Sequence, residues 1–316
     1  MRAVLYGSYG GVEVMQWGNI PLPKPGHHQI LVRTIATSLN PVDWRIRNGE
    51  MQLMVNNKFP KGIGLDFAGI VEAVGKDVSR FNVGDEVFGL LSYQNAGSIA
   101  EYVIADEKLT TKKPIGISFE EAASLPMAGV ASLTALIDKG KISGNMNVLI
   151  NGCTGGVGQL AVMIAKNAGA HVTGTCSTQA KEKAKQLGVD IVIDFTKDNV
   201  LEMEQAFDLI FDTAGNLSYN NCKSILKSQG VFLELNITIS NLFFGWYNNM
   251  FSSKKVRSII AKPSLDKIVL LGNLASKGKL KPIIGKQYML KDALEAYKNV
   301  ENGEKNIGKT IVVNSM

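Results

Sequence analysis

A glycine-rich turn carries the most specific chemistry in this sequence of 316 residues. The segment Gly152-Cys153-Thr154-Gly155-Gly156-Val157-Gly158 follows the apolar run Val148-Leu149-Ile150 and opens a stretch with helical spacing. Glycines allow a tight bend and close approach to a pyrophosphate, which unpaired N–H groups at a helix N-terminus bind. The spacing is a variant of the usual fingerprint, and the alternative is a turn used only for packing. We predict that a dinucleotide binds here, at Gly155, Gly156 and Val157.

The end of the next strand bears on which dinucleotide binds. Proteins that bind NAD usually place an acidic residue about 20 positions further on, where it holds the ribose 2′-hydroxyl. Here the strand 171–176 is followed by Ser177-Thr178, with no carboxylate. Ser177 can donate a hydrogen bond to a 2′-phosphate, and Lys181 adds positive charge, although it could also be an ordinary solvated lysine. This pattern favours NADPH.

Regular alternation of strands and helices surrounds the turn. Apolar strands at 148–150, 171–176, 191–193, 209–211 and 231–235 are separated by helical segments, which predicts a doubly wound parallel sheet covered on both faces. Ligands of such sheets bind at the carboxyl ends of the strands. We therefore predict further cofactor contacts after the fourth and fifth strands, at Thr213, Ala214, Asn216, Leu235 and Asn236.

The rest of the chain has a different texture. The first third contains short β-propensive runs separated by turn residues, which is typical of a small barrel or sandwich. The tail 288–313 returns to that style. We therefore expect an α/β protein with a mainly β domain formed by 1–122 and 262–316, and a Rossmann-type domain formed by 123–261.

Composition limits the cellular setting and the partners. Apolar residues make up 45% of the chain and charged residues 20%, which indicates a globular protein. The net charge is +6 without a dense basic cluster, so we do not expect nucleic-acid binding. Three cysteines without a CxxC pair, no leader-like N-terminus and no long apolar run predict a cytoplasmic protein without a transmembrane segment.

Several segments together resemble the medium-chain dehydrogenase/reductase superfamily, specifically its zinc-free quinone oxidoreductase and enone reductase branch. The resemblance extends over essentially the whole chain and implies that the mainly β domain is GroES-like. The segments that carry it are Asn40-Pro41-Val42-Asp43-Trp44-Arg45, Gly64-Leu65-Asp66-Phe67-Ala68-Gly69-Ile70-Val71, Val83-Gly84-Asp85-Glu86-Val87-Phe88-Gly89, 151–158, Gly278-Lys279-Leu280-Lys281-Pro282 and Gly308-Lys309-Thr310-Ile311-Val312.

The zinc ligands of the superfamily's alcohol dehydrogenases have no counterpart in this chain. Asn40 stands where they carry a cysteine, and Gly64-Leu65-Asp66 stands where they carry Gly-His-Glu. His27, His28 and His171 are not spaced as a metal site. Catalytic zinc needs three protein ligands in a shaped cavity. We therefore expect no metal.

The resemblance implies NADPH-dependent reduction of quinones or α,β-unsaturated carbonyl compounds. It places Asn40 near the nicotinamide, although Asn40 could also cap a helix that begins at Pro41. Met127 and Ser132 match the helix that approaches the nicotinamide, but relatives read Gly-Leu-Thr-Ala where this chain reads Gly129-Val130-Ala131-Ser132. Tyr93 could donate to a substrate oxygen or could be a surface loop residue. A homodimer is expected.

Other interpretations remain at this point. One is a non-catalytic NADPH-binding protein that senses redox state or binds RNA, and another is a zinc alcohol dehydrogenase. The aromatic segment 243–251 has several interpretations: it could cover the substrate cleft, form a dimer interface, rest on a membrane beside Lys254, Lys255 and Arg257, or simply be buried.

Overall fold

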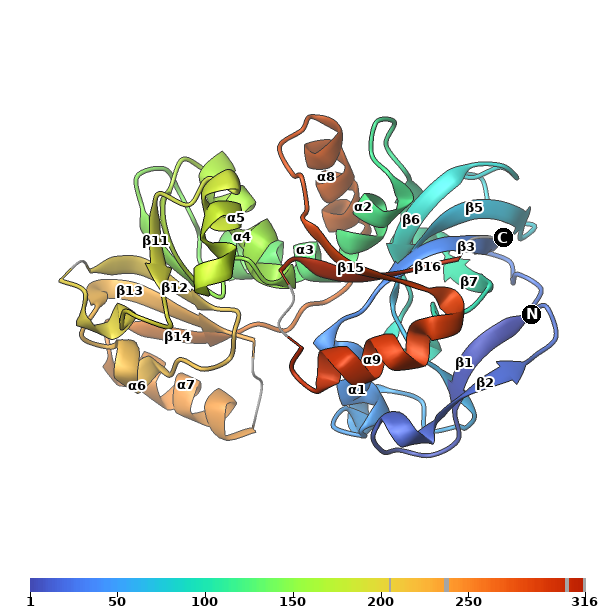
Figure 1. Ribbon diagram of the computed structural model, residues 1–316, viewed down its shortest axis with the longest axis horizontal. Coiled ribbons are helices and arrows are strands. Elements are labelled where there is room, and N and C mark those ends of the chain that lie inside the picture. The colour runs from blue at the N-terminus through green and yellow to red at the C-terminus, as the bar shows by residue number, and fades with distance from the viewer. Residues whose placement is uncertain (205, 236–238, 305–306, 315–316) are drawn as a thin grey trace. The chain divides into compact units, whose positions relative to one another are not determined.

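The computed structural model describes residues 1–316 except 205, 236–238, 305–306 and 315–316 (Figure 1). The chain forms two compact units. The first comprises Met1–Met127 and Pro263–Met316, and the second comprises Ala128–Lys262. The division falls inside helix α3 (Pro126–Leu133), whereas the sequence predicts a boundary before it, at 122.

The first unit is built around a mixed sheet with the order β15-β16-β3-β5-β6-β8, in which β7 also pairs with β3. The pairing is antiparallel except between β15 and β16. Strand β16 comes from the C-terminal segment and pairs with β3 from the N-terminal segment, so both segments build one core. The strands are β3 (Gln29–Ser38), β5 (Asp66–Val74), β6 (Glu86–Leu90), β7 (Tyr102–Asp106), β8 (Thr110–Lys112), β15 (Ile284–Met289) and β16 (Lys309–Val313).

A second, smaller sheet and several helices complete the first unit. The small sheet has the order β2-β1-β4, with β1 (Arg2–Tyr6), β2 (Met15–Asn19) and β4 (Lys61–Gly62). Val4, Tyr6, Leu39, Ile63 and Tyr297 share one buried cluster, which joins this sheet to the helix near the C-terminus. The helices are α1 (Pro41–Arg47), α2 (Phe119–Ser124), α8 (Leu265–Ser276) and α9 (Ala293–Glu301).

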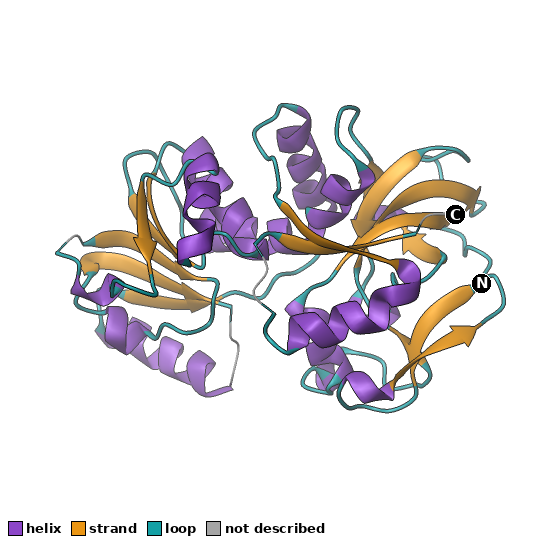
Figure 2. Cartoon of the chain, viewed as in Figure 1, coloured by secondary structure: helices purple, strands orange, loops and turns teal. Residues whose placement is uncertain are grey.

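The second unit contains a parallel sheet with the order β11-β10-β9-β12-β13-β14. Numbered along the chain, this is the order 3-2-1-4-5-6 of the Rossmann fold. Figure 2 shows helices on both faces of this sheet, as the apolar strands require. The strands are β9 (Asn147–Asn151), β10 (His171–Cys176), β11 (Ile191–Asp194), β12 (Phe207–Asp212), β13 (Leu226–Glu234) and β14 (Lys255–Ser258), and the helices are α4 (Gly156–Asn167), α5 (Lys181–Gln186), α6 (Tyr219–Cys222) and α7 (Ile239–Phe251).

Two elements differ from the expectation. The helical segment expected between the fourth and fifth strands is only the short α6, because buried Ile225 and Leu226 lead directly into β13. The aromatic segment 243–251 after β13, for which no element is predicted, lies within α7. Most of its large apolar side chains are exposed, although their spacing is that of an amphipathic helix whose apolar side is normally buried.

Gly69 in β5 provides a test of this packing. A Cβ at this position would collide with the backbone carbonyl oxygen of Arg33 in the neighbouring strand β3. We expect Gly69→Ala to lower the free energy of unfolding by about 1–3 kcal/mol, as overpacking does. Thermal unfolding followed by circular dichroism measures this loss. Gly7→Ala is the matched control, because a Cβ there meets nothing within 4 Å. Equal melting temperatures for the two variants would contradict the prediction.

Candidate cofactor and substrate site

The glycine turn lies between β9 and α4, as the sequence predicts. Gly152 has a φ of 80°, a left-handed conformation that glycine adopts without strain. A Cβ on Gly158 would collide with the carbonyl oxygen of Gly152, so helix and turn approach each other too closely for a side chain. Gly155 is the N-cap residue of α4. Gly152 and Gly158 are therefore required by the backbone path itself.

The N-terminus of α4 is the feature that suits a phosphate. The first N–H groups of a helix lack intrahelical acceptors, and the helix dipole adds partial positive charge there. In this chain the first turn contains Gly156, Val157 and Gly158, with no acidic side chain. An anion can therefore approach the backbone closely, as a pyrophosphate requires.

Polar side chains gather at the carboxyl ends of β9, β10 and β12. The Asn151 amide donates to Asp212 Oδ1 (2.7 Å) and to Asn216 Oδ1 (2.6 Å), and it accepts from Thr175 Oγ1 (2.6 Å). Thr213 Oγ1 donates to the Asn151 carbonyl oxygen (2.6 Å). Asn151, Thr175 and Asn216 also line a hollow of about 340 Å³. The strand order reverses between β9 and β12, where open α/β sheets bind ligands.

The predicted contacts after the fourth and fifth strands have different outcomes. Thr213 and Asn216 belong to this polar group, and the methyl group of Ala214 lies 3.1 Å from an ideal Cβ on Gly152. Leu235 is half-buried directly after β13. Asn236 lies outside the described residues. Their contact with a cofactor stays a prediction.

A carboxylate that the sequence analysis missed lies beside the end of β10. Asp194 ends β11 and pairs in register with Cys176, and its fully enclosed side chain lies 3.4 Å from Lys181 Nζ. Hydroxyl groups of Thr178 and Thr196 donate to it at 2.6 Å and hold the pKa of Asp194 far below its ordinary range. Lys181 is therefore an ion-pair partner as well as a possible phosphate ligand, and Ser177 is half-buried next to it.

The second group of interest lies in the first unit, around Asn40. The Asn40 amide nitrogen donates to Asp66 Oδ2 (2.8 Å), and its oxygen accepts from Lys309 Nζ (2.6 Å). Ser38 Oγ and the Met127 backbone N–H (2.8 Å) also donate to Asp66. All of these side chains are buried, Met127 included. The amide of Asn40 therefore has one fixed orientation, set by a cation on one side and a carboxylate on the other.

Asp43 adds a second carboxylate to this buried group. Its Oδ2 accepts from the Asn40 backbone N–H (2.9 Å) and from the Tyr297 hydroxyl (3.1 Å), while Oδ1 is buried without a hydrogen-bond partner among the described residues. Burial, opposed by the Asn40 N–H and reinforced by the charge of Asp66, raises the pKa of Asp43 to about 7. Lys309 is the cation that faces both carboxylates, and burial lowers its own pKa.

Tyr93 lies near these carboxylates. It begins a short 3-10 turn (Tyr93–Asn95) and lines a hollow of about 250 Å³ together with Tyr6, Ile46 and Lys61. Burial, with the charges of Asp43 and Asp66, raises the pKa of Tyr93 to about 12, so its hydroxyl keeps its proton at neutral pH. The side chain that sequence reasoning left open as a loop residue is thus half-buried beside the Asn40 group.

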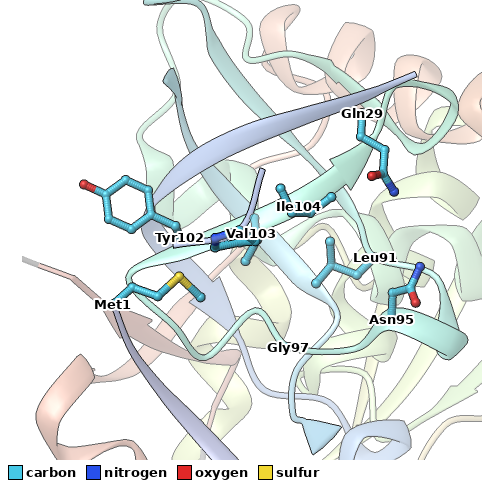
Figure 3. Close-up of a pocket in the computed structure, with 9 residues that line it drawn as sticks. Met1, Gln29, Leu91, Asn95, Gly97, Tyr102, Val103 and Ile104 are labelled. Atoms are coloured by element: carbon cyan, nitrogen blue, oxygen red, sulfur yellow. The ribbon is translucent and has the colours of Figure 1, made fainter. Parts of the chain in front are cut away.

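Another hollow of the first unit lacks comparable chemistry. It has a volume of about 340 Å³ and is lined by residues that include Leu91, Val103 and Ile104, with polar groups from Gln29, Asn95 and Tyr102 (Figure 3). Its lining holds no carboxylate, histidine, cysteine or lysine side chain. General acid–base or metal chemistry therefore has less support there than beside Asn40.

Ser132 and Met127 occupy the helix that the resemblance placed near the nicotinamide. Ser132 is fully buried, and its hydroxyl lies within hydrogen-bond distance of the carbonyl oxygens of Ala128 (2.8 Å) and Val157 (3.1 Å). It thereby connects α3 to the first turn of α4. A ligand contact by Ser132 or Met127 stays a prediction.

The residues at the positions that carry zinc ligands in the superfamily's alcohol dehydrogenases do not suit a metal ion in this chain. Asn40 and Leu65 supply no anionic or imidazole ligand, and Asp66 is already engaged by Ser38, Asn40 and Lys309. Within the described part of the chain, no group of three or more His, Cys, Asp or Glu side chains could hold a metal.

The raised pKa of Asp43 makes a prediction about pH dependence. The folded protein keeps this proton between pH 3.8 and about 7, where the unfolded chain releases it, so Asp43 lowers the stability as the pH rises through this window. Asp43→Asn retains an acceptor for Asn40 and Tyr297 but cannot ionise. We expect the variant to gain stability relative to the unmodified chain between pH 5 and 8, by about 1 kcal/mol or more.

Urea unfolding at several pH values measures this difference. Asp266→Asn, at an exposed position in the first turn of α8, is the control and should show no such gain. Parallel pH profiles for the Asp43 variant and the unmodified chain would contradict the assignment.

Comparison with known proteins finds family profiles that match the N-terminal and the C-terminal parts of the chain. The family profile "Alcohol dehydrogenase GroES-like domain" matches residues 26–115, and "Zinc-binding dehydrogenase" matches 187–312. The chain is 32% identical to the chloroplast envelope quinone oxidoreductase homolog of Arabidopsis thaliana, over 99% of this chain and 98% of that protein. It is 34% identical to the NADPH-dependent alkenal/one oxidoreductase of the same plant, over 74% of this chain and 62% of that protein.

A solved structure gives the same result. The quinone oxidoreductase from Coxiella burnetii superimposes with a TM-score of 0.89 at 29% identity, covering 99% of both chains. The likeness in fold therefore extends over the full length of both chains. The chain belongs to the medium-chain dehydrogenase/reductase superfamily, in its quinone oxidoreductase and enone reductase branch of NAD(P)H oxidoreductases.

Proposed function

We propose that this protein is an NADPH-dependent, zinc-independent reductase of quinones or α,β-unsaturated carbonyl compounds. The observation that carries the proposal is the glycine turn at the N-terminus of α4, at the point where the strand order of the sheet reverses. Relatives named as quinone and alkenal/one oxidoreductases support the substrate class.

The choice of NADPH rests on the surroundings of Ser177. Residues that follow β10 offer a half-buried hydroxyl and an ammonium group, but no carboxylate that would repel a 2′-phosphate. Asp194 is near, yet its side chain is enclosed and engaged by Thr178, Thr196 and Lys181. Its charge is therefore largely compensated, and Lys181 is our candidate cation for the phosphate. The named NADPH dependence of one relative points the same way.

Zinc independence rests on the donor set of the first unit. Oxidation of an unactivated alcohol benefits from a Lewis acid, whereas an enone or quinone takes up developing negative charge on its own oxygen. Asn40, Leu65 and the ion-paired Asp66 provide no zinc site, but the Tyr93 hydroxyl near Asp66 keeps its proton and can donate a hydrogen bond. Stabilisation of an oxyanion by such donors is a major source of rate enhancement in enzymes.

When bound, the reduced nicotinamide supplies the hydride, and the residues of the chain provide position and electrostatics. Lys309 and Asp66 hold the Asn40 amide, which the resemblance places near the cofactor. Tyr93 keeps its proton at neutral pH and is our candidate donor of a hydrogen bond to the substrate oxygen. Burial of this group also keeps the local dielectric low, so each hydrogen bond is stronger than in water.

The setting of the protein stays a prediction. The described cysteines are free and buried, which is consistent with the predicted cytoplasmic location, while the named relatives include chloroplast proteins. No helix in the described part of the chain is long and apolar enough to cross a membrane. A homodimer and the absence of nucleic-acid binding are likewise expectations, which light scattering and a binding assay with RNA would examine.

Lys181 tests the cofactor preference. We expect Lys181→Gln to weaken NADPH binding about tenfold, because a charge-assisted hydrogen bond to the 2′-phosphate is lost. NADH binding should change little. Dissociation constants for both nucleotides can be measured by fluorescence titration, with Lys183→Gln on the exposed side of α5 as the matched control. Equal losses for NADPH and NADH would contradict the assigned role.

Tyr93 tests the reaction. We expect the protein to oxidise NADPH in the presence of quinones or enones, and to do so equally well after treatment with a metal chelator. Tyr93→Phe should lower kcat/KM by about a hundredfold, as loss of an oxyanion donor does, while the NADPH dissociation constant stays unchanged. Tyr102→Phe, in the separate hollow of Figure 3, is the control.

Turnover is followed by the near-ultraviolet absorbance of NADPH. If NADPH binds but no quinone or enone is reduced, the catalytic proposal fails and a binding protein remains. If turnover is normal in Tyr93→Phe, the reaction stands and the role of Tyr93 fails. If the chelator abolishes turnover, zinc independence fails.

A further inference from the structure

Helix α7 carries an exposed aromatic face. Phe243, Trp246, Tyr247, Met250 and Phe251 are between 55% and 73% exposed. Counted from Phe243, the other four lie three, four, seven and eight residues further on, which places all five along one side of the helix. A surface helix of a globular protein normally turns such a stripe toward the core. In α7 the stripe points away from it.

The opposite face of α7 is polar and packs against the edge strand β14. Asn249 exchanges two hydrogen bonds with the backbone of Val256: its Nδ2 donates to the carbonyl oxygen (2.8 Å), and its Oδ1 accepts from the N–H (2.9 Å). Asn248 Nδ2 donates to the carbonyl oxygen of Lys254 (2.9 Å). Gly245 is buried, with Val256 as its neighbour. The polar side of this amphipathic helix thus faces the sheet, and its aromatic side faces outward.

A pair of lysines flanks the aromatic face. Lys223 Nζ lies 6.0 Å from the centre of the Tyr219 ring, and that ring lies 5.9 Å from the ring of Phe244 on α7. Lys254 Nζ donates to the carbonyl oxygen of Lys223 (2.6 Å), so both cations lie at one side of the helix. Figure 1 shows α6 and α7 next to each other in this unit.

Negative charge is scarce around this face. Helix α7 contains no acidic residue, and no described carboxylate forms an ion pair with Lys223 or Lys254. The acidic residue that α7 does contact is Glu234, through Asn241 in the first turn, and it also accepts from Ser258. The surface therefore combines aromatic side chains with uncompensated positive charge.

We propose that this face of α7 docks on a lipid surface that contains anionic headgroups. Aromatic side chains concentrate at the interface between headgroups and acyl chains, and neighbouring lysines strengthen attachment to anionic lipids. The helix lies in the interface plane and does not cross the bilayer. This inference is independent of the proposed hydride acceptor, because it uses no residue of the Asn40 group or of the glycine turn.

A second copy of the chain fits this face less well. A twofold contact brings a patch against its own copy, so each patch must complement itself. Each copy would bring Lys223 and Lys254 to such a contact, while helix α7 offers no acidic residue to pair with them. Pairing of two β14 edges is also obstructed at Val256, whose N–H and carbonyl groups are already bound by Asn249.

The experiment is sedimentation of the full chain with vesicles. We expect binding to phosphatidylcholine vesicles that contain about 30% phosphatidylglycerol, and much weaker binding to pure phosphatidylcholine. Binding should fall as salt is added, because salt screens the lysines. The emission of Trp246 should shift to the blue on binding, and Trp246→Phe should abolish that shift although Trp17 and Trp44 remain.

Substitutions separate the apolar and the charged contributions. Phe243→Ser with Phe251→Ser should lower the vesicle partition coefficient about tenfold or more on anionic vesicles. Leu53→Ser with Ile115→Ser removes two apolar side chains of the first unit that are even more exposed, and it should leave binding unchanged. Lys223→Gln with Lys254→Gln should reduce binding and its salt dependence, whereas Lys24→Gln with Lys76→Gln should not.

The outcomes are decisive in each direction. Cofactor affinity, measured on every variant, shows that the second unit is intact. If the unmodified chain ignores both kinds of vesicle, or if the α7 double variant binds them normally, the proposal is overturned. If that variant instead converts an oligomer to a monomer in light scattering, with no vesicle binding by the unmodified chain, the face is a contact between copies.

Discussion

The buried ammonium group of Lys309 is the interaction on which the first unit depends. Lys309 is the first residue of β16, which pairs with β3. Its ammonium group binds the amide oxygen of Asn40, a residue 269 positions earlier in the chain. Two carboxylates, Asp43 and Asp66, are buried with this one cation. An uncompensated buried charge is costly, so one acid retains its proton until near neutral pH. Lys309 thus fixes the orientation of Asn40 at the junction of both segments, while burial and the charge of Asp66 raise the pKa of Asp43 against the opposing effect of Lys309.

The second unit follows a different constraint, in which parallel strands end at a common edge. Asn151, Thr175 and Asp212 come from three separate strands, yet they bind one another because their strands are in register. The same geometry brings Asp194 to the end of β10. Under the proposed function, the preference for NADPH therefore reflects a balance between Lys181, its carboxylate partner and a 2′-phosphate, and not only the residue after one strand.

Local features of both units could be predicted from the sequence, whereas the long-range contacts could not. The glycine turn and the parallel sheet follow from neighbouring residues and their spacing, and the structure confirms them. The GroES-like character of the mainly β part was implied by the resemblance, and the family profile confirms it. The contact of Lys309 with Asn40 depends on the pairing of β16 with β3, and that of Asp194 with Lys181 on strand order. Neither is encoded in spacing. Helix α6 is shorter than the helical segment predicted between the fourth and fifth strands, because burial of Ile225 and Leu226 in the sheet outweighed local helical character.

Helix α7 shows why an apolar pattern alone does not reveal its partner. The edge strand β14 has backbone groups that need hydrogen bonds, and Asn249 satisfies those of Val256 more directly than an apolar side chain could. Once the polar side of the helix serves the sheet, its aromatic side cannot also be buried there. The free energy available from covering that side must then come from outside the unit, and the nearby lysines specify an anionic medium. The contact that closes the sheet edge therefore also creates the exposed surface.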